Sequence, residues 1–137
     1  MNDSTQEYSH TGREALILDT GAIITGLPLM TPIKCYTTTK VIEEVKDRES
    51  RERLERLLEA GRIEVVDPKP EYIDKVRKNI KTKNLSETDI TIIALALQLK
   101  DQNINITVAT DDYTIQKTLK TRYRIKATRI RYKGITP

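Results

Sequence analysis

Short apolar runs, each closed by polar or turn-forming residues, dominate the hydrophobic pattern of the chain. Residues 15–18 are all apolar, and Asp19, Thr20 and Gly21 follow them at once. A short continuous apolar run with such an end predicts a fully buried strand, of the kind found at the centre of a parallel sheet. Further strands are predicted for residues 34–37, 62–66, 105–109 and, at the edge of the sheet, 125–130.

Helical periodicity fills the intervals between these strands. Gly26, Pro28 and Pro32 indicate one longer loop. Helices are predicted for residues 22–24, 38–45, 50–60, 71–81, 86–97 and 113–120. The alternation of buried strands with helices predicts an α/β fold, a three-layer α/β/α sandwich with a mainly parallel central sheet.

A single domain is expected, because 137 residues are enough to bury a core. Residues 1–13 are polar and lack the apolar stretch of a signal peptide, so we expect a disordered tail before one domain over residues 14–137. The sequence has no membrane-length apolar run, which predicts a cytoplasmic protein without membrane contact. Cys35 is the only cysteine, and the only histidine, His10, lies in the tail. Any chemistry must therefore rest on carboxylates.

Acidic residues follow two of the predicted buried strands. Asp19 comes directly after residues 15–18, and Thr110-Asp111-Asp112 follows residues 105–109. Chemistry in open α/β sheets collects outside the carboxyl ends of the strands, so these acids are candidates for a functional site. An equally good explanation for Asp19 alone is that it caps the helix that follows.

Two further acids lie at helix positions. Glu44 flanks an apolar stripe that includes Val41, whereas Glu43 points further toward water. An exposed helix glutamate is the more common alternative for Glu44. The Ser86-x-x-Asp89 spacing is that of a capping box, which explains Asp89 structurally. However, the helix after Asp89 is apolar on most sides, and a carboxylate on such a buried element is costly unless a cation lies nearby.

Several carboxylates in one cleft repel one another unless a hard cation neutralises them. Mg²⁺ and Mn²⁺ prefer oxygen ligands, and Mg²⁺ usually keeps bound waters. Such a site can activate a water molecule and stabilise the charge of a phosphodiester under attack. If the acids converge, they indicate a metal-dependent nuclease.

A basic segment ends the chain. Residues 113–137 contain eight basic residues and no acid, so the rest of the chain carries a net charge of −4 within a total of +4. A basic end on an acidic body predicts a polyanionic partner, with a solvated charged surface as the alternative. Single-stranded RNA is the expected partner, because its bases are free to stack on tyrosine rings. The side chains expected to hold it are those of Lys117, Arg122, Tyr123, Arg124, Arg129, Arg131 and Tyr132.

Four short motifs resemble those of PIN-domain ribonucleases. They are Leu18-Asp19-Thr20-Gly21-Ala22, Glu44, Ser86-x-Thr88-Asp89 and Thr110-Asp111-Asp112. Together with residues 36–47, 85–90 and 113–116, they are similar to the Nob family, and the resemblance runs from about residue 15 to about residue 133. Members of that family are endonucleases that mature the 3′ end of small-subunit ribosomal RNA.

The resemblance implies a role for each acid. The residues that would form the catalytic and metal-binding set, with Mg²⁺ or Mn²⁺, are Asp19, Glu44, Asp89 and Asp112. Asp111 would be a neighbour that shares metal binding, and the Thr-x-Asp spacing favours Asp112 without deciding between the two. The hydroxyl side chains that would orient the acids are those of Thr20, Ser86 and Thr110.

The chain departs from the Nob pattern in one respect. Nob proteins generally carry a zinc ribbon after the PIN domain, and no cysteine pair follows here.

The partner implied by the resemblance is precursor small-subunit rRNA or the pre-ribosomal subunit. A toxin ribonuclease of a toxin–antitoxin pair and a non-catalytic RNA-binding module are the alternatives, although a complete acid set argues against the second. The oligomeric state stays open, and a homodimer is compatible with the sequence.

Overall fold

Five strands form a single sheet in the computed structural model, which describes residues 13–79 and 84–130. The strands are β1 (Glu14–Leu18), β2 (Lys34–Thr37), β3 (Ile63–Val65), β4 (Asn105–Ala109) and β5 (Lys126–Thr128). Their order is β3-β2-β1-β4-β5, and every neighbouring pair is parallel. The sheet predicted as mainly parallel is therefore wholly parallel, and the predicted last strand does lie at its edge.

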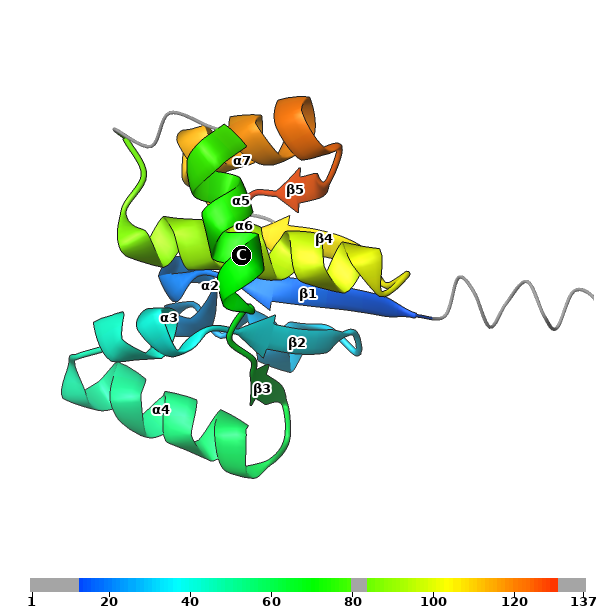
Figure 1. Ribbon diagram of the computed structural model, residues 1–137. Coiled ribbons are helices and arrows are strands. Elements are labelled where there is room, and N and C mark those ends of the chain that lie inside the picture. The colour runs from blue at the N-terminus through cyan, green and yellow to red at the C-terminus, as the bar shows by residue number, and fades with distance from the viewer. Residues whose placement is uncertain (1–12, 80–83, 131–137) are drawn as a thin grey trace, which may run out of the picture.

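Helices connect the strands (Figure 1). They are α2 (Thr20–Ile24), α3 (Thr39–Glu44), α4 (Arg48–Glu59), α5 (Pro70–Asn79), α6 (Glu87–Asp101) and α7 (Tyr113–Thr118). A 3₁₀ turn, η1, covers Leu27–Met30, and a π-helical turn, η2, continues α7 over Leu119–Tyr123. The helix predicted from residue 50 begins earlier, because Asp47 caps α4 by accepting a hydrogen bond from the Ser50 amide (3.0 Å). Almost all of the predicted tail, and the end of the helix predicted over 71–81, lie outside the described residues.

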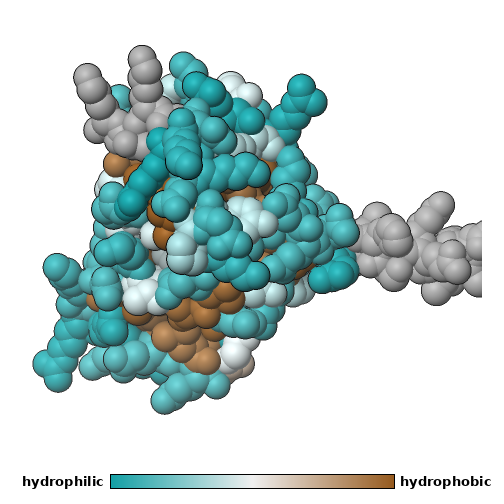
Figure 2. Space-filling model, viewed as in Figure 1, coloured by the Kyte–Doolittle hydropathy of each residue, from teal (hydrophilic) through white to brown (hydrophobic). Residues whose placement is uncertain are grey.

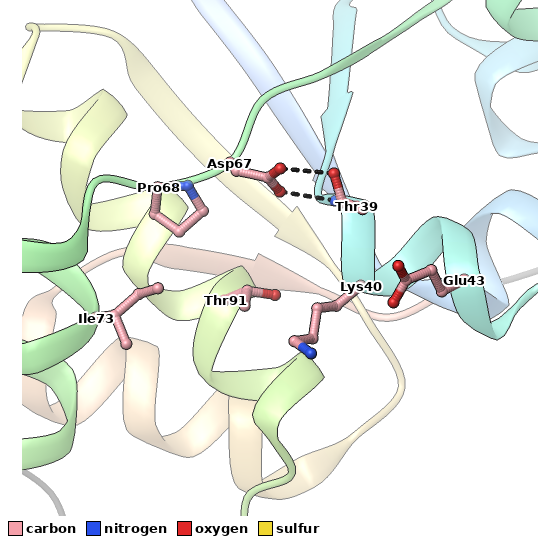
Figure 3. A pocket seen from close by; sticks show the side chains of 7 residues that line it. All are labelled: Thr39, Lys40, Glu43, Asp67, Pro68, Ile73 and Thr91. Carbon is pink, nitrogen blue, oxygen red and sulfur yellow. Dashed lines mark hydrogen bonds between the residues drawn. The ribbon is translucent and has the colours of Figure 1, made fainter.

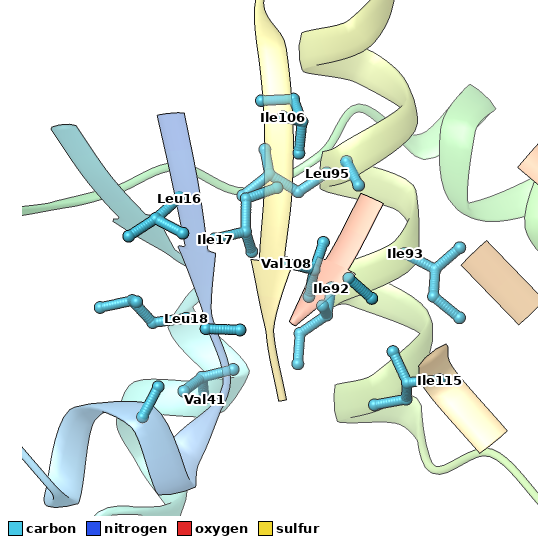
Figure 4. Packing of buried hydrophobic residues seen from close by; sticks show 14 of the residues in the cluster. Leu16, Ile17, Leu18, Val41, Ile92, Ile93, Leu95, Ile106, Val108 and Ile115 are labelled. Carbon is cyan, nitrogen blue, oxygen red and sulfur yellow. The ribbon is translucent and has the colours of Figure 1, made fainter. Parts of the chain in front are cut away.

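Helix α6 is the central helix of the core. It packs along β1 and β4, with α5 against it, and its residues 90–99 are all buried. Ile17 of β1 points toward α6, whereas Leu16 and Leu18 point to the opposite side of the sheet (Figure 4). Right-handed crossovers place α2 and α4, which pack on β1 and β3, on that opposite side. The predicted three-layer α/β/α sandwich is confirmed.

Strand β1 lies at the centre of the sheet, where the order in which strands are added reverses. The chain continues from β1 to β2 and β3 on one side, and later to β4 and β5 on the other. Strands β1 and β4 pair in register along their whole length, from Glu14–Asn105 to Leu18–Ala109. The crevice at the carboxyl ends of two such strands is the usual binding position in open parallel sheets. The residues that follow Leu18 and Ala109 therefore stand where a site is expected.

The surface is mostly polar. On the face shown in Figure 2, apolar side chains gather mainly where β3 and α4 lie in Figure 1, and Val65 of β3 is exposed there. Within the described parts of the chain, no helix is long and apolar enough to cross a membrane.

Candidate active site

Asp19 stands between the end of β1 and the start of α2. Its Oδ1 accepts a hydrogen bond from the Ala22 amide (3.3 Å), so it caps α2. Its Oδ2 accepts a hydrogen bond from Thr110 Oγ1, on the adjacent strand end. Thr110 is fully buried, and its hydroxyl oxygen accepts a hydrogen bond from the Asp112 amide (3.0 Å). The cap explanation of Asp19 is correct, and the same carboxylate is tied to the second strand-end motif.

Asp111 and Asp112 are both exposed, but their side chains accept hydrogen bonds from different segments of the chain. Asp112 Oδ1 accepts a hydrogen bond from the Ile115 amide (3.0 Å) and caps α7. Asp111 Oδ1 accepts one from the Ile130 amide (2.7 Å), two residues beyond β5. Asp112 is thus tied to the start of α7, and Asp111 to the chain that leaves β5.

Two threonine hydroxyls hold Glu44. Thr20 Oγ1 donates to Glu44 Oε1 (2.9 Å), and Thr88 Oγ1 donates to Glu44 Oε2 (2.7 Å), so the end of α3 is joined to α2 and to α6. Glu43 and Glu44 are both exposed, but Glu43 borders a separate pocket and only Glu44 of the two accepts these hydroxyl hydrogen bonds, in agreement with the preference for Glu44. Thr20 contacts an acid as predicted. The sequence reasoning missed Thr88, although a threonine in the first turn of an otherwise apolar helix is a signal for a buried polar contact.

Asp89 and Ser86 form the predicted capping box at the start of α6. Ser86 Oγ accepts a hydrogen bond from the Asp89 amide (3.1 Å), and Asp89 Oδ2 accepts one from the Ser86 amide (3.0 Å). Asp89 is half-buried. The Ser86 amide therefore orients the Asp89 carboxylate, whereas the Ser86 hydroxyl, expected in that role, binds the Asp89 amide instead.

Electrostatic effects show that the acids lie near one another. Burial raises the pKa of Asp19 above its ordinary value, and the negative charge of Asp111 adds to the rise. Burial likewise raises the pKa of Asp89, and the charges of Asp112 and Glu44 raise it further. Asp111 thus acts on Asp19, whereas Asp112 and Glu44 act on Asp89, and a bound cation would relieve the repulsion within each group.

By its chemistry this acid set fits a hard divalent cation, because every candidate ligand atom is a carboxylate oxygen. Within residues 13–79 and 84–130, however, no group of three or more His, Cys, Asp or Glu side chains is arranged to hold a metal ion. Asp19, Asp89 and Asp112 each use a carboxylate oxygen to cap a helix. The fold gathers the predicted set at one edge of the sheet, with these side chains oriented as helix caps.

The predicted RNA-binding residues divide between the two edges of the sheet. Arg129 follows β5 at the carboxyl edge, directly before Ile130. Arg124 precedes β5 at the amino edge, where it lines a cavity of about 250 Å³ with Lys100 and Lys126. Arg124, although predicted to hold RNA with Arg129, therefore lies at the edge opposite the acids, because β5 carries the chain from one edge to the other.

The remaining predicted RNA contacts differ in their surroundings. Lys117, in the last turn of α7, and Arg122, in η2, are exposed. Tyr123 packs against the hydrophobic core and its hydroxyl is buried, so it serves packing first, and the prediction that it stacks on bases is weakened. Arg131 and Tyr132 lie outside the described residues.

A pocket of about 260 Å³ lies between α3, the residues after β3, and α6 (Figure 3). Lys40 and Glu43 line it from α3, and Thr91 lines it from α6. Asp67 closes one side by accepting hydrogen bonds from the Thr39 amide (2.8 Å) and the Thr39 hydroxyl (2.6 Å). None of its lining residues belongs to the predicted acid set, so the pocket is distinct from the candidate active site.

The wholly parallel sheet, with its acids at the carboxyl ends of β1 and β4, defines a class of protein. Residues 16–99, more than half of the chain, match the family described as "PIN domain of ribonuclease". The chain therefore belongs to the PIN-domain ribonuclease family. PIN nucleases generally use divalent metal ions.

Two kinds of curated relative stand out within that family. The chain is 43% identical to Ribonuclease VapC3 of Aeropyrum pernix, over 98% of this chain and 99% of the relative. It is 42% identical to Endoribonuclease Nob1 of Pyrococcus abyssi, over 74% of this chain, and 38% identical to Endoribonuclease Nob1 of Methanocaldococcus jannaschii, over 76%. Those matches span 60% and 51% of the two Nob1 proteins. The relatives are named as ribonucleases or endoribonucleases. Their similar identities do not decide whether this chain is of the VapC3 kind or of the Nob1 kind.

A solved structure supports the fold. The PIN domain endonuclease Utp24 matches with a TM-score of 0.54 and 18% sequence identity, over 87% of this chain and 86% of that chain. At this level of identity the likeness shows a common fold.

Proposed function

We propose that this protein is a metal-dependent endoribonuclease that hydrolyses phosphodiester bonds of single-stranded RNA. The observation that carries the proposal is the placement of Asp19, Glu44, Asp89 and Asp112 around the carboxyl ends of β1 and β4. Thr20, next to Asp19, donates to Glu44, and the charges of Glu44 and Asp112 act on Asp89. Membership of a ribonuclease family supports the reaction.

Each of these acids has a neighbour that fixes its direction. Thr110 holds Asp19, Ser86 holds Asp89, and the hydroxyls of Thr20 and Thr88 hold Glu44. Bound Mg²⁺ or Mn²⁺ would supply an activated water and neutralise charge on the phosphate. The carboxylates would hold that ion. Burial, with a contribution from neighbouring negative charges, raises the pKa of Asp19 and Asp89, and a bound cation would favour the charged form of both.

RNA also needs a cationic contact, because an acidic site repels phosphate. Arg129, exposed at the same edge of the sheet, is the best-placed candidate, and Lys117 of α7 is the next. Unpaired bases are accessible in single-stranded RNA and hidden in a duplex, which favours a single-stranded substrate.

For the substrate, we propose precursor small-subunit rRNA, of the 16S/18S type, cut during maturation of its 3′ end in the cytoplasm. Similarity to the Nob1 endoribonucleases supports this substrate. A second candidate is a toxin ribonuclease, and the specific observation in its favour is the match to VapC3 over nearly the whole of both chains.

Incubation with precursor small-subunit RNA and with an unrelated single-stranded RNA, each with Mn²⁺, tests the proposal. Wild-type protein is expected to cut the precursor near the 3′ end of the mature sequence and to leave the unrelated RNA intact. Cuts in both RNAs, together with arrest of growth on expression in a host cell, would favour the toxin. RNA binding without cleavage under every metal condition would overturn the enzymatic proposal.

A further inference from the structure

The segment that leaves β5 is fastened to the start of the candidate site. The ladder between β4 and β5 ends with a hydrogen bond from the Thr110 amide to the Thr128 carbonyl (2.9 Å). One residue beyond Thr110 and two beyond Thr128, a side chain continues the connection: Asp111 Oδ1 accepts a hydrogen bond from the Ile130 amide (2.7 Å). The Asp111 carboxylate thus keeps the chain after β5 close to the candidate site, beyond the point where β4 and β5 stop pairing.

Packing reinforces this hydrogen bond. A Cβ atom added to Gly21 would lie 3.2 Å from Ile130 Cδ1 and 3.5 Å from Asp19 Oδ1. The half-buried Ile130 side chain therefore uses the space that Gly21 leaves free, in the first turn of α2 and next to Asp19. Arg129, one residue earlier and exposed, is carried to the same place.

We infer that Asp111 is a positioning residue for RNA binding: it fastens Ile130 and thereby sets Arg129 beside the acids to hold a substrate phosphate. This inference rests on the proposed endoribonuclease function and assigns Asp111 a role apart from metal binding. Asp112, which caps α7 and is not bonded to the described residues after β5, then remains the acid of the pair assigned to the metal-binding set.

Two substitutions of Asp111 separate positioning from metal binding. Asp111→Asn keeps an oxygen that accepts the Ile130 amide and removes the negative charge. Asp111→Ala removes both. A positioning role needs the acceptor, whereas a metal ligand needs the charge.

The experiment measures binding of a single-stranded precursor RNA in the presence of chelator, together with Mn²⁺ binding in the absence of RNA. Asp111→Ala is expected to weaken RNA binding about five- to tenfold, the scale of one lost charged contact. Asp111→Asn is expected to bind RNA at least as tightly as wild type, and neither variant is expected to lose Mn²⁺ binding. Hydrogen exchange at the Ile130 amide should be faster in Asp111→Ala than in Asp111→Asn, which verifies that the hydrogen bond was lost.

A double variant tests the route through Arg129. Asp111→Ala should add almost nothing to the loss of RNA affinity caused by Arg129→Ala, because both changes remove one contact. Additive losses would overturn the inference, as would equal loss of Mn²⁺ binding in both Asp111 variants. Unchanged RNA affinity in Asp111→Ala, with wild-type protein binding and cutting RNA normally, would overturn the inference and leave the proposed function standing. Failure of wild-type protein to bind RNA would overturn both.

Discussion

The carboxylates of the candidate site each do two things at once. Asp19, Asp89 and Asp112 cap α2, α6 and α7, and each also interacts with a neighbouring acid: Asp19 with Asp111, and Asp89 with Asp112. Asparagine is as good an N-cap as aspartate, so an Asp→Asn substitution can keep the cap and remove the charge. This property separates the contribution of the acids to catalysis from their contribution to the fold.

The first prediction concerns Asp19 and Asp89. Because their pKa values are raised in the folded protein, each contributes stability below the ordinary value of 3.8, and that contribution is lost as the pH rises through the raised pKa. Asp19→Asn and Asp89→Asn should therefore unfold at a higher temperature than wild type at neutral pH without metal, and the gain should shrink as the pH falls toward 3.8. Thermal unfolding measured across this pH range checks the result.

The same variants, and Asp112→Asn, are expected to lose RNA cleavage while staying folded. A variant that unfolds at neutral pH but keeps the specific activity of its folded fraction would show that the acid is only a structural cap.

The second prediction compares the two neighbouring glutamates of α3. Both are exposed, but Glu44 is held by the hydroxyls of Thr20 and Thr88, whereas Glu43 borders another pocket. Glu44→Gln should lower cleavage severely, and Glu43→Gln should be nearly silent. Initial rates at saturating RNA and Mn²⁺ measure the difference, and equal rates for the two variants would refute the assignment of Glu44.

The third prediction concerns Thr88, which sequence reasoning missed. Thr88→Val keeps the shape of the side chain and removes the donor to Glu44 Oε2, so kcat should fall about tenfold, the scale found when a group that orients a metal ligand is lost. Thr88→Ser keeps a hydroxyl and is the matched control. Should both variants lose the same activity, packing of the methyl group, and not the hydrogen bond, would be the cause.

At the scale of the elements, sequence pattern predicted the helix starts well. The Ser86 capping box and the cap at Thr38 follow from side chains that bond to amides three residues away, so spacing alone reveals them. The start of α4 was placed too late, because Asp47 was not recognised as its cap. Contacts between distant elements, such as Thr88 with Glu44, depend on how α3 and α6 approach each other, which local spacing does not encode.

The basic segment shows the same limit. Its charge was visible in the sequence, but its division between two edges required the direction of β5. Two arginines that look equivalent in the sequence, Arg124 and Arg129, consequently lie at opposite ends of one short strand.

This pair provides the fourth prediction. Arg129→Ala should weaken single-stranded RNA binding and reduce the slope of log affinity against log salt by about 0.7, the value for one lost phosphate contact on a single strand. Arg124→Ala removes the same charge at the far edge and should have a smaller effect on both quantities. Binding isotherms at several salt concentrations measure the difference. Equal effects of the two variants would mean that net charge alone attracts RNA.

For the whole molecule, the sequence revealed the architecture because its strands are buried and short. Residues 15–18 and 105–109 read as strands without ambiguity, and both are confirmed with almost the same bounds. The order of the strands was not visible in the sequence, because the pairing of β1 with β4 joins segments 91 residues apart at Leu18 and Ala109.

The fifth prediction concerns metal removal. The core of the described chain is formed by apolar side chains of β1, β4 and α6, so chelator should stop RNA cleavage and leave the fold intact. Addition of Mn²⁺ to chelated protein should restore cleavage and raise the unfolding temperature, because the ion binds only the folded acid cluster. Circular dichroism and thermal unfolding with and without chelator check both statements. Full cleavage in excess chelator would rule out the metal mechanism.

The central position of β1 has a consequence for how the protein is made. During synthesis, Asp19 and Glu44 emerge early, but Asp89 and Asp112 follow much later, and β4 must be complete before it can pair with β1. A growing chain therefore cannot assemble these four acids before Asp112 has been added. If these acids cut RNA, the growing chain cannot cut the message and the ribosome that produce it before β4 and Asp112 have been made and β4 has paired with β1.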